Sequence, residues 1–245
     1  MTQAEDPSPR FISGVISPVT LPPVKQDEPL LPPDVIEVTT PLGITDYTNE
    51  AVNEAMLRYW DCVEKLQEQK AQRVTICGFP IAAQMGRKYF QELAEETERR
   101  AGIPGDSDAE ATVAAMHHLG VKRVAMASRW ADELNEGVKV FLADAGIETL
   151  TTTSEGQWAR QAFSMSIEQG IKLAIELGRK AMKQAPQADG LFLPGGVWRS
   201  LAVVPFLEGE FGVPVFTNPI SMKWRLMSLG IAPAVQGWGR LLASA

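Results

Sequence analysis

Cysteine and histidine are scarce in this sequence, with two residues of each among 245. Cys62 lies in a segment with helical periodicity and Cys77 at the end of an apolar segment typical of a strand. This arrangement is not a disulfide framework, so we expect two free thiols. No cysteine and histidine cluster has the spacing of a metal site, and no G-x-x-x-x-G-K-[ST] nucleotide motif occurs. The sequence therefore predicts no metal and no nucleotide cofactor.

Long apolar runs and basic clusters are also missing. No run approaches the roughly 20 apolar residues that span a bilayer. The opening MTQAEDPSPR has acids and prolines where a signal peptide has basic and then apolar residues. Lys and Arg are scattered among acids, and the formal net charge is -7, which disfavours a nucleic-acid partner. We expect a cytoplasmic protein with neither a membrane nor a nucleic-acid partner, and the sequence leaves homo-oligomer formation open.

What is present is enough apolar sequence for a large core. Hydrophobic residues make up 45% of the chain, which suits one large domain or two similar halves. Apolar periodicity predicts strands at 11–16, 73–77, 122–127, 147–151, 190–193 and 213–216. It predicts helices at about 49–68, 89–101, 108–119, 130–145, 158–183 and 220–229, with a long loop after the first strand.

Strands that alternate with helices predict an α/β fold with parallel sheets. Ligands of such sheets bind beyond the carboxyl ends of the strands. The loops to examine for a site are therefore 78–83, 128–130, 194–199 and 217–222.

Five segments resemble one family of α/β enzymes. They are GVISP near the start, ICGFPIAAQMG, LGVKRVAMASRWADELNEGVKVFLADAGIE, GLFLPGGVW, and GVPVFTNPISMKWRLMSLGI near the end. In order and spacing they resemble the aspartate/glutamate racemase superfamily, in particular its arylmalonate decarboxylase and maleate isomerase branch. The resemblance implies two pseudo-symmetric lobes, each a short parallel sheet flanked by helices, with the active site in the cleft between them. We expect residues 1–108 and 220–245 to form the first lobe and 109–219 the second.

The resemblance also implies a chemistry that needs no metal or organic cofactor. Family members bring one cysteine from each lobe to the cleft, where one thiolate removes a proton from carbon and the other thiol returns one. Decarboxylating members keep only the second cysteine, as proton donor. They expel a carboxylate in an apolar pocket while hydroxyl and backbone N–H groups hold the surviving carboxylate as an enediolate.

This sequence departs from the family pattern at those positions. Gly78 stands at the first cysteine position, followed by Phe79 and Pro80 where hydroxyl residues are usual, and Pro194 stands at the second. Trp130 replaces a usual tyrosine. A two-cysteine racemase is therefore disfavoured. The residues that we expect to contact a ligand are Gly78, Phe79, Pro80, Trp130, Pro194, Gly195, Gly196, Trp198, Arg199 and Asn218.

Two residues are candidates for acid–base chemistry. Cys77 lies one residue before the first cysteine position, so strand alternation turns it to the opposite face unless the strand end shifts; otherwise it is a small buried hydrophobe. Asp108 follows Ser107, and either side chain could simply cap the next helix. If burial raised its pKa, Asp108 could serve as a general base.

Aromatic and basic residues complete the expected site. Phe79, Trp130 and Trp198 lie at predicted strand ends and suggest an aromatic-walled pocket, or alternatively a packed cleft without a ligand. Arg129 and Arg199 flank these loops and could hold a substrate carboxylate.

Three functions follow as hypotheses. The first is a cofactor-independent lyase that decarboxylates a small aromatic or branched carboxylic acid. The second is a hydrolase or isomerase of a small acid or cyclic amide with Asp108 or a neighbouring acid as base. The third is a ligand-binding relative without catalysis.

Overall fold

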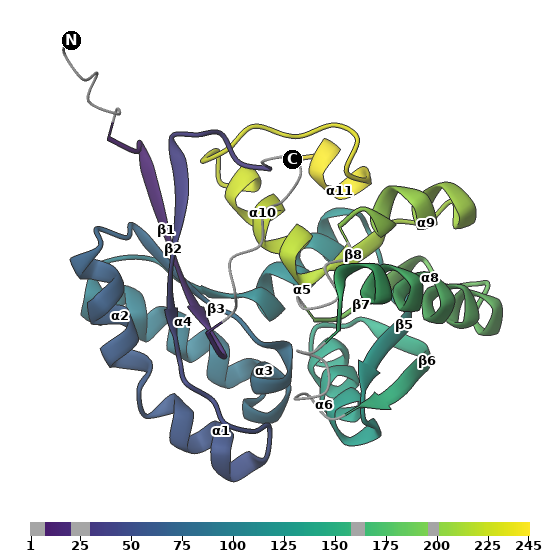
Figure 1. The fold of residues 1–245 in the computed structure, drawn as a ribbon, viewed down its shortest axis with the longest axis horizontal. Helices are drawn as coiled ribbons and strands as arrows, with labels where there is room; N and C mark the ends of the chain where they lie inside the picture. Colours follow the sequence, from purple (N-terminus) through teal and green to yellow (C-terminus); the bar gives the residue numbers. More distant parts are fainter. Residues whose placement is uncertain (1–7, 21–29, 158–164, 196–200) are drawn as a thin grey trace.

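The computed structural model describes residues 8–20, 30–157, 165–195 and 201–245, and it contains two four-stranded parallel sheets (Figure 1). The first sheet has the order β2-β1-β3-β4 and the second β6-β5-β7-β8. In both, the third strand in sequence adds beside the first, and the fourth beside the third. The expected α/β architecture with two similar halves is confirmed. The division into a first lobe of residues 1–108 and 220–245 and a second lobe of residues 109–219 stays a prediction.

The strands of the first sheet are β1 (Phe11–Ser17), β2 (Val35–Pro41), β3 (Arg73–Ile76) and β4 (Gly105–Ser107). Those of the second are β5 (Arg123–Trp130), β6 (Glu148–Gln157), β7 (Gly190–Leu193) and β8 (Val215–Thr217). Every residue of β3 and β7 is buried, as expected for central strands of parallel sheets.

Ten helices connect or flank these strands in the described residues. They are α1 (Asn49–Met56), α2 (Tyr59–Glu68), α3 (Phe79–Met85), α4 (Arg87–Ala101), α5 (Asp108–His118), α6 (Asp132–Ala143), α8 (Ile167–Gln184), α9 (Val203–Phe211), α10 (Asn218–Ser228) and α11 (Arg240–Ala243). Helices α5 and α10 pack against each other at the junction of the two sheets. None of the described helices is long and apolar enough to cross a membrane.

Some boundaries differ from those predicted. The expected helix at 49–68 is two helices, because the chain breaks at Leu57 and Arg58, where the Arg58 guanidinium donates to the carbonyls of Leu42 and Gly43. Strand β2 lies in the segment predicted as a long loop, because prolines flank it and its apolar residues Val35, Ile36 and Val38 do not alternate regularly with polar ones. Strand β5 continues to Trp130, which we had placed in the following helix.

A short sequence repeat underlies the two-fold likeness of the sheets. Residues 102–108 read G-I-P-G-D-S-D and residues 212–218 read G-V-P-V-F-T-N. Each copy forms a turn, then a three-residue strand, then the first residue of a helix. Asp108 and Asn218 therefore occupy equivalent positions, at the starts of α5 and α10.

α10 is tied to the first sheet by charged side chains. Arg225 Nε donates to Asp106 Oδ2 at 2.8 Å, and buried Arg73 of β3 binds the same oxygen. Lys223 pairs with Glu37 of β2. Because these contacts fix α10 against β2, β3 and β4, they also fix Asn218 relative to the ends of the first sheet.

Candidate active site at the facing strand ends

The carboxyl ends of the central strands and their neighbours define the site. Ile76 at the end of β3 pairs with Ser107 at the end of β4, and Leu193 at the end of β7 pairs with Thr217 at the end of β8. The residues that follow these four strands come together from segments far apart in sequence. This is the place where ligands bind in parallel α/β sheets.

Hydroxyl caps start both helices of the site. Ser107 Oγ accepts a hydrogen bond from Glu110 N at 3.0 Å, and Thr217 Oγ1 accepts one from Ile220 N at 3.3 Å. Capping by Ser107, one of the two alternatives for this turn, is confirmed. Because Ser107 and Thr217 act as caps, the side chains of Asp108 and Asn218 are available for other contacts.

Those contacts form one chain of hydrogen bonds across the two sheets. Gly78 N donates to Asp108 Oδ2 at 3.0 Å, and Asn218 Nδ2 donates to the same oxygen at 3.2 Å. Gly195 N donates to Asn218 Oδ1 at 2.8 Å. Asp108 is 5% exposed and Asn218 2%. The network thus joins four strand ends through buried atoms.

The glycines of this network have the same unusual backbone. Gly78 has φ +117° and Gly195 φ +101°, values that L side chains rarely adopt. A Cβ at Gly78 would lie 2.9 Å from Pro18 Cγ and 3.1 Å from Ile81 Cδ1. A side chain at the first cysteine position would therefore strain the backbone and require Pro18 or Ile81 to shift. Both glycine N–H groups donate to protein side chains, Gly78 to Asp108 and Gly195 to Asn218.

Burial makes Asp108 a weak acid near neutral pH. It raises the pKa of the carboxyl from 3.8 to about 7, and the negative charge of Asp106 adds to the rise. The N–H groups of Gly78 and Ala109 and the amide of Asn218 oppose it, since they stabilise the carboxylate. Asp108 Oδ1 accepts no hydrogen bond of good geometry from the described residues. Near pH 7 the group can therefore either give or take a proton.

Tyr47 is a further candidate for the site that sequence reasoning missed. It lies in the loop between β2 and α1, with 7% of its surface exposed. Burial raises the pKa of its hydroxyl, and the negative charge of Asp108 raises it further. Tyr47 thus supplies a neutral hydroxyl that interacts electrostatically with Asp108, a type of group that Trp130 lacks. No pattern in the 42–48 segment marks it, because its loop reaches the site only through the fold.

Cys77 lies beside the network without joining it. Its Sγ is 3.5 Å from Met222 Sδ of α10, on the side where Arg73, Thr75 and Met222 line a small cavity. The pKa of the thiol is raised well above its usual value, first by burial and then by the charge of Asp108. The group therefore stays a neutral thiol at neutral pH. Cys62 is buried in α2, also as a free thiol.

The expected aromatic residues occupy packed positions. Phe79 is 1% exposed, and its ring lies 5.2 Å from that of Phe141 and 5.6 Å from that of Phe192. Trp130 is 4% exposed, and its carbonyl accepts a hydrogen bond from Asn135. Phe79 and Trp130 thus belong to the core at the end of each sheet, rather than to an open pocket wall.

The remaining candidates are placed as follows. Pro80 is buried in the first turn of α3, and Pro194 is buried directly after β7. Gly196, Trp198 and Arg199 lie outside the described residues. Arg129 is 1% exposed, with Nη1 3.8 Å from Met165 Sδ, and burial lowers its pKa to about 10. Arg129 therefore remains a candidate to bind a carboxylate at the end of β5.

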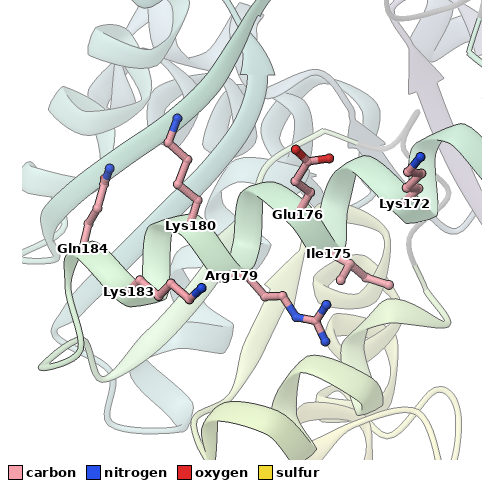
Figure 2. Close-up of a pocket in the computed structure, with 7 residues that line it drawn as sticks. All are labelled: Lys172, Ile175, Glu176, Arg179, Lys180, Lys183 and Gln184. Atoms are coloured by element: carbon pink, nitrogen blue, oxygen red, sulfur yellow. The ribbon is translucent and has the colours of Figure 1, made fainter.

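A surface pocket of the second half lies away from these strand ends. Figure 2 shows its seven lining residues, all from α8, with Lys180 and Gln184 directed to one side of the helix and Arg179 to the other. Arg179 pairs with Glu210 of α9. Because one exposed helix supplies the whole lining, this pocket has none of the convergent buried groups of the strand-end site. Within the described residues, no group of three or more His, Cys, Asp and Glu side chains could hold a metal ion.

The fold and this network define the class: a two-sheet parallel α/β protein whose candidate site lies where the two sets of strand ends meet. A family model for arylmalonate decarboxylase matches residues 13–242, and the chain belongs to that family.

Individual relatives agree with this assignment. The chain is 28% identical over 243 residues to an arylmalonate decarboxylase from Bordetella bronchiseptica, covering 98% of each protein. Among solved structures, a liganded arylmalonate decarboxylase with one glycine-to-cysteine and one cysteine-to-serine change matches with a TM-score of 0.85 at 26% identity, covering 96% of this chain and 100% of that one. Unliganded arylmalonate decarboxylase matches with a TM-score of 0.81 at 28% identity, again over 96% and 100%.

A more distant structure shares the fold. A cysteine-to-serine mutant of Nocardia farcinica maleate cis-trans isomerase, with a covalently bound succinylcysteine intermediate, has a TM-score of 0.82 at 20% identity, covering 96% of this chain and 99% of that one. The resemblance to arylmalonate decarboxylase is confirmed, and the likeness to the isomerase is one of fold.

Proposed function

We propose that this protein is a cofactor-independent decarboxylase-like lyase that acts on a small aromatic or branched malonate-type acid, with Asp108 as the proton donor. Membership of the arylmalonate decarboxylase family supports an enzyme with lyase activity. The observation that carries the assignment of Asp108 is its position. It is a buried carboxyl at the facing strand ends, with a pKa of about 7, in a chain that has glycine and proline at the two cysteine positions.

In the proposed step, one proton replaces the carboxylate that the substrate loses as carbon dioxide. Cleavage of the carbon–carbon bond releases carbon dioxide and leaves the bond's electron pair on the substrate as an enediolate. The Asp108 carboxylic acid gives its proton to that carbon, and the resulting carboxylate takes a proton from solvent before the next turnover. A general acid is most effective when its pKa lies near the working pH, which suits a carboxyl shifted to about 7. Burial of the site favours loss of charged carboxylate as neutral carbon dioxide.

Other groups bind or orient the substrate in this proposal. The neutral Tyr47 hydroxyl near Asp108 donates to a substrate carboxylate, and Arg129 is a second, cationic candidate for the same task. In this proposal Asp108 rather than Cys77 transfers the proton, because the raised pKa of the Cys77 thiol makes it a much weaker acid than the Asp108 carboxyl.

The test is carbon dioxide release from a panel of aryl- and alkylmalonates, with deuterium incorporation at the α-carbon measured in D2O. We expect turnover without added metal or nucleotide, and continued turnover when Cys62→Ser and Cys77→Ser are combined. Loss of activity in Cys77→Ser alone would instead indicate that the Cys77 thiol is the proton donor. A thermal-shift screen of the same acids reports binding without turnover, because a ligand of the folded state raises its stability.

A second candidate function uses the same carboxyl as a base. With a pKa of about 7, Asp108 is also ionised in part at neutral pH, so proton abstraction for isomerisation or hydrolysis of a small acid or cyclic amide is chemically available. The likeness to maleate cis-trans isomerase is one of fold. Product analysis separates the two, because only the lyase releases carbon dioxide. Tight acid binding with no product from any substrate class would instead favour a ligand-binding protein without catalysis.

A further inference from the structure

Asn218 is the counterpart of Asp108 in the second half of the molecule, yet it carries an amide. Both residues begin a helix after a short strand, and each accepts an N–H from a positive-φ glycine at the end of the neighbouring strand. The amide differs from the acid in one respect that matters here: it can accept through Oδ1 and donate through Nδ2 at the same time.

The orientation of this amide is fixed by Gly195. A backbone N–H can bind only an acceptor, so the 2.8 Å contact from Gly195 N requires the carbonyl oxygen of Asn218 to face it. The NH2 group must then point the other way, where it lies 3.2 Å from Asp108 Oδ2. The assignment of Asn218 oxygen and nitrogen is thus settled by the network itself.

This orientation determines where Asp108 holds its proton. Oδ2 faces two donors, Gly78 N and Asn218 Nδ2. A proton on Oδ2 would point at these N–H groups and would break at least one of their hydrogen bonds. Oδ1 accepts no hydrogen bond of good geometry from the described residues. The neutral acid therefore keeps Oδ2 as its carbonyl oxygen and carries the proton on Oδ1.

We infer that Asn218 is a positioning residue that holds the proton of Asp108 on Oδ1 and so sets the direction in which the acid delivers it. This inference rests on the proposed role of Asp108. It also gives a reason for an amide at this place: a second carboxyl at 218 could donate to Asp108 only when protonated, and the two acids would then share protons. The amide leaves a single titrating group in the network.

The test is an NMR titration of Asp108 in protein labelled with carboxyl-13C aspartate, its resonance assigned by its loss in Asp108→Asn. In Asn218→Ala the carboxylate loses one donor, so its pKa should rise by about one pH unit, a tenfold change in the acid dissociation constant. Turnover of the malonate substrate should fall with KM little changed, because the proton is no longer held in one direction. The matched control is Thr217→Ala, which removes the α10 cap and leaves Asn218 in place; its Asp108 titration should match the wild type.

An unchanged Asp108 titration in Asn218→Ala would overturn the inference, as would an equal shift in Thr217→Ala. If Asn218→Ala does not fold, the near-isosteric Asn218→Asp serves instead. It should convert the single titration of Asp108 into two coupled steps, and a single unshifted step would contradict the inference. The titration needs no turnover, so it stands apart from the proposed function, which fails on its own if Asp108→Asn keeps full activity.

Discussion

The pair Gly78 and Asp108 in the first half of the site and the pair Gly195 and Asn218 in the second share one backbone design. Each has a glycine with positive φ at one strand end and a polar side chain at the start of the helix after the next strand. They differ in charge, since the first pair can titrate and the second cannot. Because Gly78 and Pro194 stand at the two cysteine positions, this difference leaves one buried acid, Asp108, hydrogen-bonded to the neutral amide of Asn218. The comparison suggests that chemistry resides in the first pair and orientation in the second.

Replacing Asp108 by Asn should have the largest effect, because it makes the two halves chemically alike. Asn can still accept from Gly78 N while presenting no proton of useful acidity. We expect the rate of turnover to fall by about 10²- to 10⁴-fold, the usual contribution of general acid–base catalysis. Steady-state kinetics on the substrate found in the malonate panel gives the measurement. Activity within a few-fold of wild type would remove Asp108 from the mechanism.

The same substitution should stabilise the protein at alkaline pH. The pKa of Asp108 is higher in the folded state than its ordinary value of 3.8, so the folded protein holds this proton longer than the unfolded chain. Its contribution to stability therefore falls as pH rises from about 4 towards 7 and is constant above that. At about 1.36 kcal/mol per pH unit, the cost at pH 8 is at most ~4 kcal/mol. Urea unfolding should find Asp108→Asn more stable than wild type at pH 8, with little gain at pH 4; the reverse order would contradict the raised pKa.

Gly78→Ala tests the backbone half of the comparison. The new Cβ would lie 2.9 Å from Pro18 Cγ in a backbone region that disfavours L residues. We expect a loss of about 1–3 kcal/mol in the free energy of unfolding, from strain of this kind. Gly102→Ala is a suitable control, because Gly102 also has positive φ but its Cβ would meet nothing within 4 Å. Equal losses in the two variants would show that packing against Pro18 adds nothing.

Removal of either helix cap should lower the free energy of unfolding by a smaller amount, and by a similar amount in the two halves. Ser107→Ala and Thr217→Ala each remove one cap hydrogen bond, and each should cost about 1 kcal/mol of unfolding free energy. Because the two halves share this feature, the losses should be similar, and the pH dependence of turnover should be unchanged in both. A cap variant that moves the pH profile would mean that the cap also controls Asp108.

Much of this fold could be predicted from the sequence, and the reasons are local. The apolar segments 73–77 and 190–193 end in glycine or proline turns and match β3 and β7 closely. The position of Ser107 and Asp108 before a helical segment predicted a helix cap at this turn. Strand β2 was not predicted, because its apolar residues do not alternate regularly with polar ones and prolines surround it. Strand β4 reads Gly-Asp-Ser and has no large apolar residue, whereas the equally short β8, which was predicted, contains Val215 and Phe216.

The site was predictable in its location and less so in its contacts. Asp108 and Asn218 were both selected from their places at strand ends, and the structure joins them by a hydrogen bond across 110 residues of sequence. Tyr47 could not be found, because only the path of the 42–48 loop brings it near Asp108. Phe79 was expected at a pocket wall, but its ring meets Phe141 and Phe192 in the core. These outcomes depend on long-range packing, which periodicity does not report.

The pH dependence of carbon dioxide release from an arylmalonate tests the central claim most directly. An acid with a pKa of about 7 is protonated below that pH, so kcat/KM should be level at acidic pH and fall tenfold per pH unit above about 7. Asp108→Asn should lose this activity at every pH. A rate that rises through pH 7, or an Asp108→Asn variant with the wild-type profile, would contradict the assignment of Asp108 as the proton donor.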